Sequence, residues 1–301
     1  MKILITGATG LIGQEIIRQC LDQNIDVNYL TTKKTKQHNK VSYRGFYWNP
    51  DSGFIDSSCF SGVEVIINLA GASIAKKWTS KYKQYIKSSR IKALQLLFKT
   101  IDNDNIPIKH IVSASAIGIY PDSQTHFYEE DSEEYDNSFL ADVVSCWEQE
   151  VDRFKAINIM VAKIRIGIVL SKNGGVLPKL ERPIKLYFGS VLGNGKQWQS
   201  WIHIKDLAAL FLFIIKEKLE GVYNGVAPNA ISQKEFLKKF AVVLKKPILL
   251  PGIPTLVINL LMGDMSTLVL ASQHVSSKKI EIAGFNFEFT HLNTALFDLY
   301  Q

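Results

Sequence analysis

The stretch Thr6-Gly7-Ala8-Thr9-Gly10-Leu11-Ile12-Gly13 decides the fold of this chain through the spacing of its glycines. It joins an apolar segment at residues 1–6, which predicts a buried strand, to an amphipathic helix predicted over residues 11–21. A second strand is predicted over residues 26–30, which completes a βαβ unit. In that context the first glycine permits a tight turn, the second lets backbone approach a pyrophosphate, and the third lets the helix pack closely on the strand.

The amides at the start of the predicted helix face this loop, and the helix dipole favours an anion there. The sequence therefore predicts a dinucleotide site; the alternative is a glycine-rich loop that binds nothing. In the first case the cofactor lies against Gly7, Thr9, Gly10, Leu11, Ile12 and Gly13.

The end of the second predicted strand decides which dinucleotide fits. NAD is held there by an Asp or Glu on the ribose hydroxyls. This chain instead has Leu30-Thr31-Thr32-Lys33-Lys34, with two ammonium groups and no carboxylate. A 2′-phosphate is favoured, so the sequence predicts NADP, bound with the help of Thr32, Lys33 and Lys34. The alternative is that these lysines form a solvated turn.

The rest of the chain alternates between two kinds of segment. Apolar, β-branched runs stand at residues 63–69, 110–114, 159–166 and 222–225, and helix-like segments separate them at residues 81–101, 139–156 and 205–217. This alternation predicts an α/β fold, a Rossmann-type doubly wound parallel sheet with a smaller carboxy-terminal region on the substrate side.

Two domains are expected from the change of pattern along the chain. The NADP-binding Rossmann domain covers residues 1–225, of which residues 168–200 contribute to the substrate side. A small carboxy-terminal domain covers residues 226–301, where short helices and prolines replace the regular alternation.

Composition narrows the class of protein. With 301 residues and 47% hydrophobic residues, the chain is neither disordered nor collagen-like. Its longest apolar run, residues 207–215, is far shorter than the roughly 20 residues that span a bilayer, and its start lacks the pattern of a secretory signal. The isolated Cys20, Cys59 and Cys146 form neither a disulfide framework nor a zinc pattern. We expect a cytoplasmic protein without a metal site.

The charge of the chain bears on its partners. The net charge is +7, but the lysines are scattered and no nucleic-acid-binding motif accompanies them. We expect an anionic small-molecule substrate, and neither nucleic acid nor a membrane as partner.

Further motifs follow in order along nearly the whole chain: Asn68-Leu69-Ala70-Gly71, Trp78, Ser89-Arg90, Ser113-Ala114-Ser115-Ala116-Ile117-Gly118-Ile119-Tyr120, Trp147-Glu148, Arg165-Ile166-Gly167, Gly174-Gly175, Ser200-Trp201-Ile202-His203-Ile204-Lys205-Asp206, Asn224, Ala227-Pro228 and Gly284-Phe285. Together with the glycine loop they resemble the extended short-chain dehydrogenase/reductase superfamily. The resemblance is to its atypical branch called "epimerase family protein", which is NAD-dependent epimerase/dehydratase-like with a carboxy-terminal domain of unknown function.

The resemblance adds Leu69, Ala70, Gly71 and Arg165 to the expected cofactor site. It also implies that residues beyond about 248 form the extra carboxy-terminal domain. One departure is that Thr32 and Lys33 stand where relatives usually place an arginine. A lysine ammonium, which acts as a point charge, then replaces the planar guanidinium.

In the wider superfamily a Tyr-x-x-x-Lys pair on a helix moves the proton, and a nearby serine polarises the carbonyl. Ser115 matches that serine by position, but residues 139–148 contain neither tyrosine nor lysine, a loss that the resemblance implies for the whole branch. Tyr29 and Lys33 have the right spacing but lie at the adenosine end. We therefore predict Ser115 and Tyr120 as catalytic residues. Their alternatives are a hydrogen bond from Ser115 to the nicotinamide amide or a loop, and a packing role for Tyr120.

Substrate contacts are predicted for Arg90, Trp201 and His203. Arg90 has the alternative of a solvated helix face, and His203 with Asp206 that of starting a helix and fixing a loop. Glu148 is interpreted as a structural anchor.

Two functions remain open from the sequence. The first is an NADP-dependent oxidoreductase or epimerase acting on a small hydroxyl or carbonyl compound, with a nucleotide sugar as one candidate. The second is a non-catalytic NADP-binding sensor or scaffold that has lost its proton relay.

Overall fold

The computed structural model describes residues 1–301, apart from the side chain of Asn39. The chain divides into two compact units, each built from several segments. Unit 1 consists of Met1–Ala116, Asp142–Arg165 and Ala208–Tyr223. Unit 2 consists of Ile117–Ala141, Ile166–Leu207 and Asn224–Gln301.

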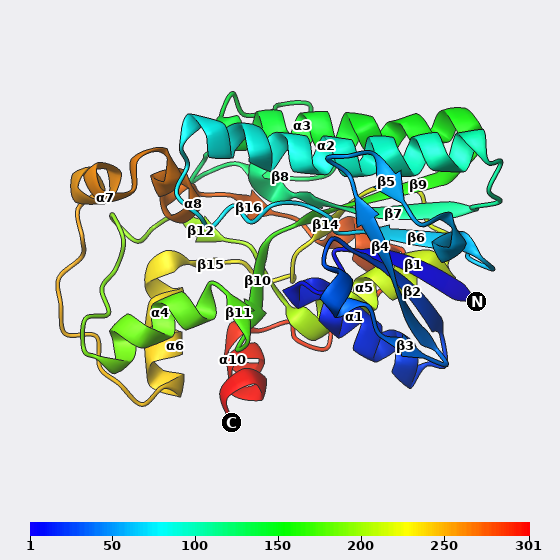
Figure 1. Ribbon diagram of the computed structural model, residues 1–301. Coiled ribbons are helices and arrows are strands. Elements are labelled where there is room, and N and C mark those ends of the chain that lie inside the picture. The colour runs from blue at the N-terminus through cyan, green and yellow to red at the C-terminus, as the bar shows by residue number, and fades with distance from the viewer. The chain divides into compact units, whose positions relative to one another are not determined.

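The large sheet has the strand order β14-β9-β7-β6-β1-β2-β4-β3, with β5 paired to β4 (Figure 1). Its strands are β1 (Lys2–Thr6), β2 (Asp26–Thr31), β3 (Asn39–Lys40), β4 (Tyr43–Asn49), β5 (Phe54–Ile55), β6 (Val65–Asn68), β7 (His110–Ala116), β9 (Met160–Ile166) and β14 (Gly221–Gly225). The pairs β1–β2, β1–β6, β2–β4 and β6–β7 are parallel. The predicted doubly wound parallel sheet is thus confirmed.

Strand β1 is the centre of this topology. Ile3, Leu4 and Ile5 are fully buried, as expected for a strand covered on both faces. The chain leaves β1 toward β2 on one side and later returns to β6 on the other. Ligands of open α/β sheets bind at such a switch point, outside the carboxyl ends of the strands.

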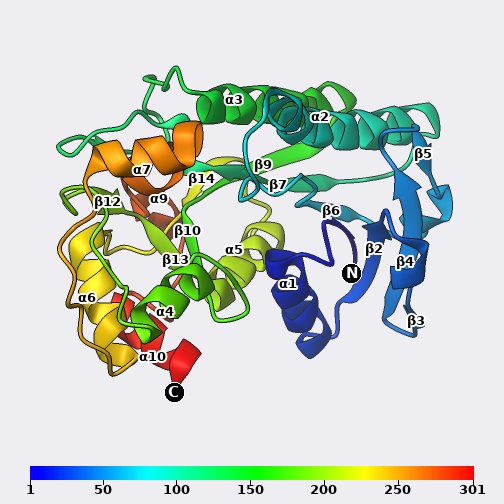
Figure 2. The same cartoon turned by 60° about the vertical axis from the view of Figure 1, so that its left-hand side comes forward.

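The helices of unit 1 cover the two faces of the sheet. α1 (Leu11–Asp22) lies on one face together with the greater part of α5 (Ile204–Lys216) (Figure 2). α2 (Ser80–Asn103) and α3 (Phe139–Asp152) lie on the other. Short 3-10 turns complete the unit: η1 (Lys34–Lys36), η2 (Ser57–Phe60) and η4 (Arg153–Ile157).

Strand β4 has no counterpart among the strands expected from the sequence. Its residues mix polar and aromatic side chains, and only Gly45 and Trp48 within it are buried, so it shows no apolar run. It forms because a parallel partner, β2, is available. A Cβ at Gly45 would lie 2.4 Å from the Tyr29 ring, so the missing side chain makes room for that buried aromatic.

Unit 2 holds smaller sheets and most of the remaining helices. Its strands are β8 (Phe127–Tyr128), β10 (Ile168–Ser171), β11 (Gly174–Gly175), β12 (Trp198–Gln199), β13 (Trp201–His203), β15 (Ile231–Ser232) and β16 (His274–Val275). Its helices are η3 (Ile117–Ile119), α4 (Leu177–Lys185), α6 (Gln233–Val243), α7 (Thr255–Met262), η5 (Gly263–Ser266), α8 (Thr267–Leu270), α9 (Lys278–Ile282) and α10 (Leu292–Tyr300).

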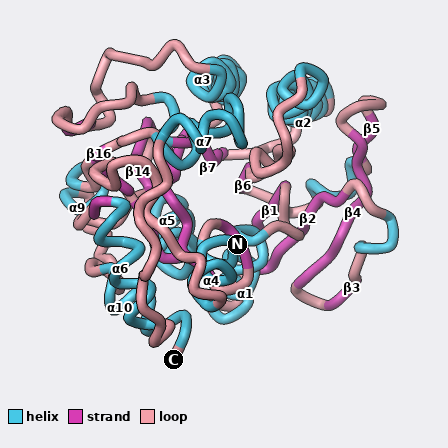
Figure 3. Tube along the Cα trace, turned by 90° about the vertical axis from the view of Figure 1, so that its left-hand side faces the viewer, coloured by secondary structure: helices cyan, strands magenta, loops and turns pink.

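Helices α6 and α10 pack side by side (Figure 3). Between them and β10 and β13 lies a buried cluster that includes Leu170, Trp201, Phe240 and Leu296. Burial of a large apolar side chain stabilises by about 1.5–3 kcal/mol, so this cluster ties the carboxy-terminal helices to the strands that precede them.

None of the helices in the described chain is long and apolar enough to cross a membrane.

Candidate functional site

The glycine loop connects β1 to α1 at the switch point. Gly7 has φ +68°, and a Cβ there would lie 2.6 Å from the Leu69 carbonyl oxygen, so no other residue fits. A Cβ at Gly13 would lie 2.6 Å from the Gly7 oxygen and 2.7 Å from the Ala8 Cα. Gly7 thus allows the tight turn, and Gly13 the close packing of the helix, that their spacing predicts.

Gly10 differs from its two neighbours in the motif. Its φ of −83° suits any residue, and the nearest atom to an added Cβ is the Gly7 oxygen at 3.2 Å. It stands at the N-cap of α1, where no side chain accepts a hydrogen bond from the helix amides. The first amides of α1 are therefore free to bind an anion, and Gly10 has no side chain to block it. A pyrophosphate needs such a place, so a dinucleotide fits this loop.

A buried polar chain links the ends of β1 and β6 to the middle of β7. Thr6 Oγ1 donates to Asn68 Oδ1 at 2.8 Å, and Asn68 Nδ2 donates to Ser113 Oγ at 2.9 Å. Thr6 Oγ1 also accepts from the backbone amides of Leu69 and Ala70, at 3.0 and 3.1 Å. This chain holds the predicted cofactor residues 69–71 beside the glycine loop. The sequence did not predict that the Thr6 hydroxyl holds this segment. The position of Thr6 at the end of β1 was the feature that could have indicated it.

The predicted adenosine end of the site follows β2. The side chains of Thr32, Lys33 and Lys34 are exposed, and the amide of Lys33 donates to Thr31 Oγ1 at 3.2 Å. The Lys34 ammonium lies 5.1 Å from the centre of the Tyr47 ring. Both lysines stay in solvent beside the strand end, where an anionic group can reach them.

Ser115 is engaged inside unit 1. Its hydroxyl donates to Glu148 Oε1 at 2.6 Å, across from β7 to α3. Arg165, on β9, donates to the same carboxylate through Nε at 2.9 Å and Nη2 at 3.1 Å, and the Lys163 ammonium lies 3.7 Å away. Ser115, Glu148 and Arg165 are 3%, 7% and 2% exposed. Arg165, which was predicted to bind the cofactor, thus directs its guanidinium at Glu148. The sequence did not reveal the contact between Glu148 and Ser115.

Arg90 occupies the space next to the 69–71 segment. A Cβ at Gly71 would lie 2.9 Å from its Cζ, and its Nη1 donates to the carbonyls of Ala72 and Ile86 at 3.2 and 2.8 Å. Its guanidinium lies 4.9 Å from the Trp147 ring centre, while Nε is buried without a partner. Burial lowers the pKa of Arg90 to about 10, so the group remains charged at neutral pH. Within the described chain no carboxylate pairs with it.

Tyr120 belongs to unit 2 and is fully buried. Its phenol donates to Asn224 Oδ1 at 2.8 Å, and its ring stacks on Tyr128 with centroids 5.2 Å apart. Proton donation from Tyr120 to a ligand requires the hydrogen bond to Asn224 to open.

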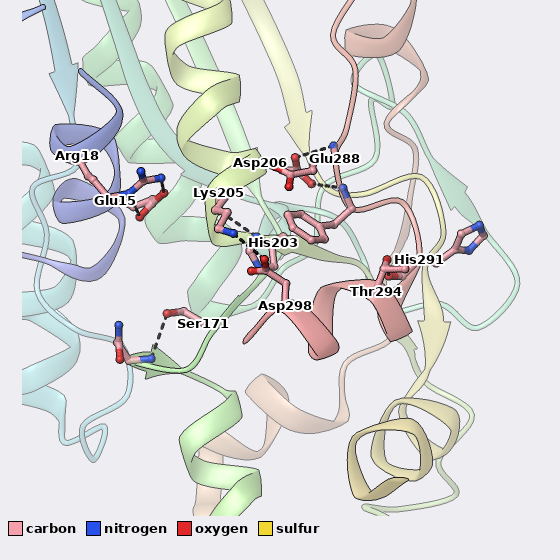
Figure 4. A network of polar contacts seen from close by, with 12 residues as sticks. Glu15, Arg18, Ser171, His203, Lys205, Asp206, Glu288, His291, Thr294 and Asp298 are labelled. Carbon is pink, nitrogen blue, oxygen red and sulfur yellow. Dashed lines mark hydrogen bonds and ion pairs between the residues drawn. The ribbon is translucent and has the colours of Figure 1, made fainter. Parts of the chain in front are cut away.

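Trp201 and His203 lie in unit 2 as well, both fully buried. Trp201 Nε1 donates to the Asn229 carbonyl at 2.9 Å. His203 packs on the Phe289 ring at a centroid distance of 3.9 Å, and its Nε2 lies 3.3 Å from Asp298 Oδ2 (Figure 4). Each side chain thus contacts the carboxy-terminal part of the chain.

Asp206 fastens the same part of the chain to the start of α5. Its two oxygens accept from the backbone amides of Glu288 and Phe289 at 2.9 and 3.0 Å (Figure 4). Burial raises the pKa of the Asp206 carboxyl, and these two hydrogen bonds act in the opposite direction.

We expect Asp206→Ala to lower the free energy of unfolding by about 2–4 kcal/mol, because two amides lose a charged acceptor at once. Urea denaturation followed by tryptophan fluorescence measures this loss. Asp206→Asn keeps one acceptor oxygen and should lose about half as much. Equal, small losses for both variants would mean that these hydrogen bonds contribute little.

No group of three or more His, Cys, Asp or Glu side chains in the described part of the chain is arranged to hold a metal ion.

Comparison with known proteins identifies the two parts of the chain separately. Residues 3–226 match the model of the NAD dependent epimerase/dehydratase family, and residues 253–299 match a domain of unknown function, DUF1731. An "epimerase family protein" of Staphylococcus saprophyticus is 37% identical over 298 residues, which are 98% of both chains. One from Staphylococcus haemolyticus is 35% identical over 300 residues, 99% of this chain and 98% of its own.

Two solved structures are similar over all of this chain. The human epimerase family protein SDR39U1 (isoform 2), solved with NADPH, has a TM-score of 0.87 and 27% identity over 99% of its chain. A nucleoside-diphosphate sugar epimerase from Corynebacterium glutamicum has a TM-score of 0.78 and 27% identity over 58% of its chain. The family match covers most of this chain and the curated relatives match it end to end. The chain therefore belongs to the NAD dependent epimerase/dehydratase family, in the group of epimerase family proteins that carry the DUF1731 domain.

Proposed function

We propose that the protein is an NADP-dependent oxidoreductase or epimerase acting on a small hydroxyl or carbonyl compound, with a nucleotide sugar as the candidate substrate. The observation that carries the proposal is the glycine cradle at the switch point of the sheet, with Gly10 open in front of the uncapped start of α1. Ser115 lies one residue before the end of β7, at the same carboxyl edge and on the far side of β6 from β1.

NADP is proposed over NAD because of charge. The residues after β2 include Lys33 and Lys34 and no carboxylate, and both side chains are exposed. The similar human protein was solved with NADPH, which supports the same choice. In this arrangement the glycine loop holds the pyrophosphate, the lysines hold the 2′-phosphate, and residues 69–71 border the cofactor at the end of β6. When bound, the nicotinamide supplies or accepts a hydride.

The substrate is proposed to be anionic because of Arg90. A half-buried guanidinium that meets only carbonyl oxygens and a ring is costly, since a charge withdrawn from water needs an opposite charge. Its unpartnered Nε and its place over Gly71 make it ready to bind a phosphate or carboxylate. The diphosphate of a nucleotide sugar has this chemistry, and the similar Corynebacterium protein is named as an epimerase of such compounds. Trp201 and His203 remain proposed substrate residues from the sequence.

The second candidate function is a non-catalytic NADP-binding sensor or scaffold. It is favoured by α3, which contains no tyrosine and no lysine, and by the buried hydrogen bond of the Tyr120 phenol to Asn224. Both candidates share the cofactor site and differ in whether any substrate is turned over.

The cofactor choice is tested by titrating NADPH and NADH into the protein and following nucleotide fluorescence. We expect NADPH to bind about 10–100 times more tightly, because each contact to the phosphate contributes about 1.5–3 kcal/mol. The Lys33→Ala, Lys34→Ala double variant should lose this preference and leave NADH binding unchanged.

Lys92→Ala is the matched control for the double variant, since Lys92 is also an exposed lysine but pairs with Asp51 at 2.7 Å. Equal affinities for the two cofactors in the native protein, or an unchanged preference in the double variant, would contradict the proposal.

A further inference from the structure

We propose that Glu148 is a positioning residue that makes Ser115 a hydrogen-bond acceptor for the bound ligand. The inference rests on the proposed function and specifies the chemistry of the ligand group at Ser115. That group must be a donor, an N–H or an O–H, and not a bare carbonyl oxygen.

The direction of the hydrogen bond follows from the groups around Glu148. A carboxylate held by a guanidinium can only accept, and Arg165 contacts it at 2.9 and 3.1 Å. The single hydrogen of the Ser115 hydroxyl therefore points to Glu148 Oε1, 2.6 Å away. Serine has no second hydrogen, so only its lone pairs remain for another partner.

Burial makes this direction costly to reverse. Ser115 and Glu148 are 3% and 7% exposed, so water cannot readily replace the serine at the carboxylate. A hydrogen bond to a charged group is also stronger than one between neutral groups. Turning the hydroxyl toward a ligand carbonyl would leave a buried carboxylate oxygen without this donor.

The place of Ser115 limits which ligand atoms it meets. It lies near the end of β7, on the side of β1 away from β2 and the lysines that follow it. With the pyrophosphate on the glycine loop, this is the side of the nicotinamide and of the substrate. Two donors are available there, the carboxamide NH₂ of the nicotinamide and a hydroxyl of the substrate.

The experiment compares two probes, NADP⁺ and its nicotinic acid analogue, in which a carboxylate replaces the carboxamide. Both are titrated by isothermal calorimetry into the native protein and into its variants. If the carboxamide is the donor, the native protein prefers NADP⁺, because a carboxylate beside an acceptor is unfavourable. Using the ratio of the two dissociation constants cancels any general loss of folded protein.

Glu148→Gln should shrink this ratio about tenfold. The glutamine oxygen takes the Oε2 position, beside Arg165 Nη2 and the Lys163 ammonium. Its amide takes the Oε1 position and donates to Ser115 Oγ, which frees the hydroxyl hydrogen for the ligand, while Arg165 Nε turns away from the amide. Glu150→Gln is the matched control, because Glu150 is on the same helix but pairs with Arg153 at the surface. It should leave the ratio unchanged.

Ser115→Ala keeps the test decisive should Glu148→Gln fail to fold. If Ser115 is an acceptor, its removal weakens the binding of NADP⁺ and leaves the analogue bound as tightly as before or more tightly. If Ser115 is a donor, its removal instead weakens the binding of the analogue, and that result overturns the proposal.

A second arm identifies the source of the donor, using UDP-glucose titrated into the NADP⁺-saturated protein. In one outcome, the variants leave the ratio of the NADP⁺ and analogue dissociation constants unchanged, but Ser115→Ala and Glu148→Gln each weaken UDP-glucose binding about fivefold or more. The donor is then a substrate hydroxyl, and the proposal stands. Unchanged binding of all three probes in both variants overturns it. Failure of the native protein to bind NADP⁺ at all would contradict the proposed function itself, a distinguishable outcome.

Discussion

Replacing Gly10 by valine is expected to weaken NADPH binding by roughly a hundredfold or more while the fold is retained. The valine side chain would fill the space in front of the α1 amides that the pyrophosphate occupies. Loss of two charge-assisted hydrogen bonds costs about 3 kcal/mol or more, which corresponds to that factor. The fold survives because Gly10 has φ −83° and the nearest atom to its Cβ is a single carbonyl oxygen at 3.2 Å.

The measurement is a fluorescence titration of NADPH, with circular dichroism to verify the fold. Gly10→Ala should weaken NADPH binding as well, but less than Gly10→Val. Gly252→Ala is the control, because a Cβ at that position makes only ordinary contacts, the nearest at 3.4 Å. A folded Gly10→Val protein that binds NADPH normally would place the cofactor elsewhere.

Turnover of any carbonyl substrate with NADPH is expected to be slow, about two to four decades below the roughly 10 s⁻¹ of a typical enzyme. The physical reason is the composition of α3, which has neither phenol nor ammonium to move the proton. Hydride transfer needs only a positioned carbonyl and cofactor, so some activity persists.

The assay is a panel of carbonyl compounds and nucleotide sugars followed by NADPH absorbance. On any active compound, Ser115→Ala should lower the rate further, and Tyr120→Phe should do so only if the hydrogen bond to Asn224 opens during turnover. Ser88→Ala is the control, since Ser88 is a serine on α2 whose hydroxyl donates to the Tyr85 carbonyl at 3.5 Å. Rapid turnover unaffected by either change would mean that the active site lies elsewhere.

Complete inactivity across the panel, with NADPH firmly bound, would favour the sensor or scaffold function. The binding and turnover experiments are therefore complementary. Binding to the glycine loop establishes the cofactor site, and turnover separates an enzyme from a binding protein that has the same fold.

The residue types of the glycine loop determined the cofactor end of the fold without help from distant residues. Gly7 has a positive φ, and Gly13 lies against the turn before its own helix. Such requirements act over a few consecutive positions, so a sequence shows them directly. The same holds for the alternation of buried strands and helices, which predicted the doubly wound sheet.

Strand β4 and the side-chain partners near Ser115 were decided only by the tertiary structure. β4 has no periodic apolar pattern, and it is a strand because β2 offers it a parallel neighbour. Ser115, Glu148 and Arg165 come from β7, α3 and β9 and meet in the interior. Periodicity tells which face of an element is buried, but not which polar group from another element will meet it there.

The same limit applies to Arg90 and to the residues around α5. The spacing of Arg90 among lysines on α2 is equally typical of a solvated helix face, yet its guanidinium is enclosed over Gly71 and Trp147. The sequence left open whether Asp206 fixes a loop, and the structure shows that it holds the amides of Glu288 and Phe289. The sequence by itself thus determined the glycine loop and the sheet, because these depend on local backbone geometry and hydrophobic period. Only the folded chain decided the partners of each buried charge, because desolvation joins groups that lie far apart in the sequence.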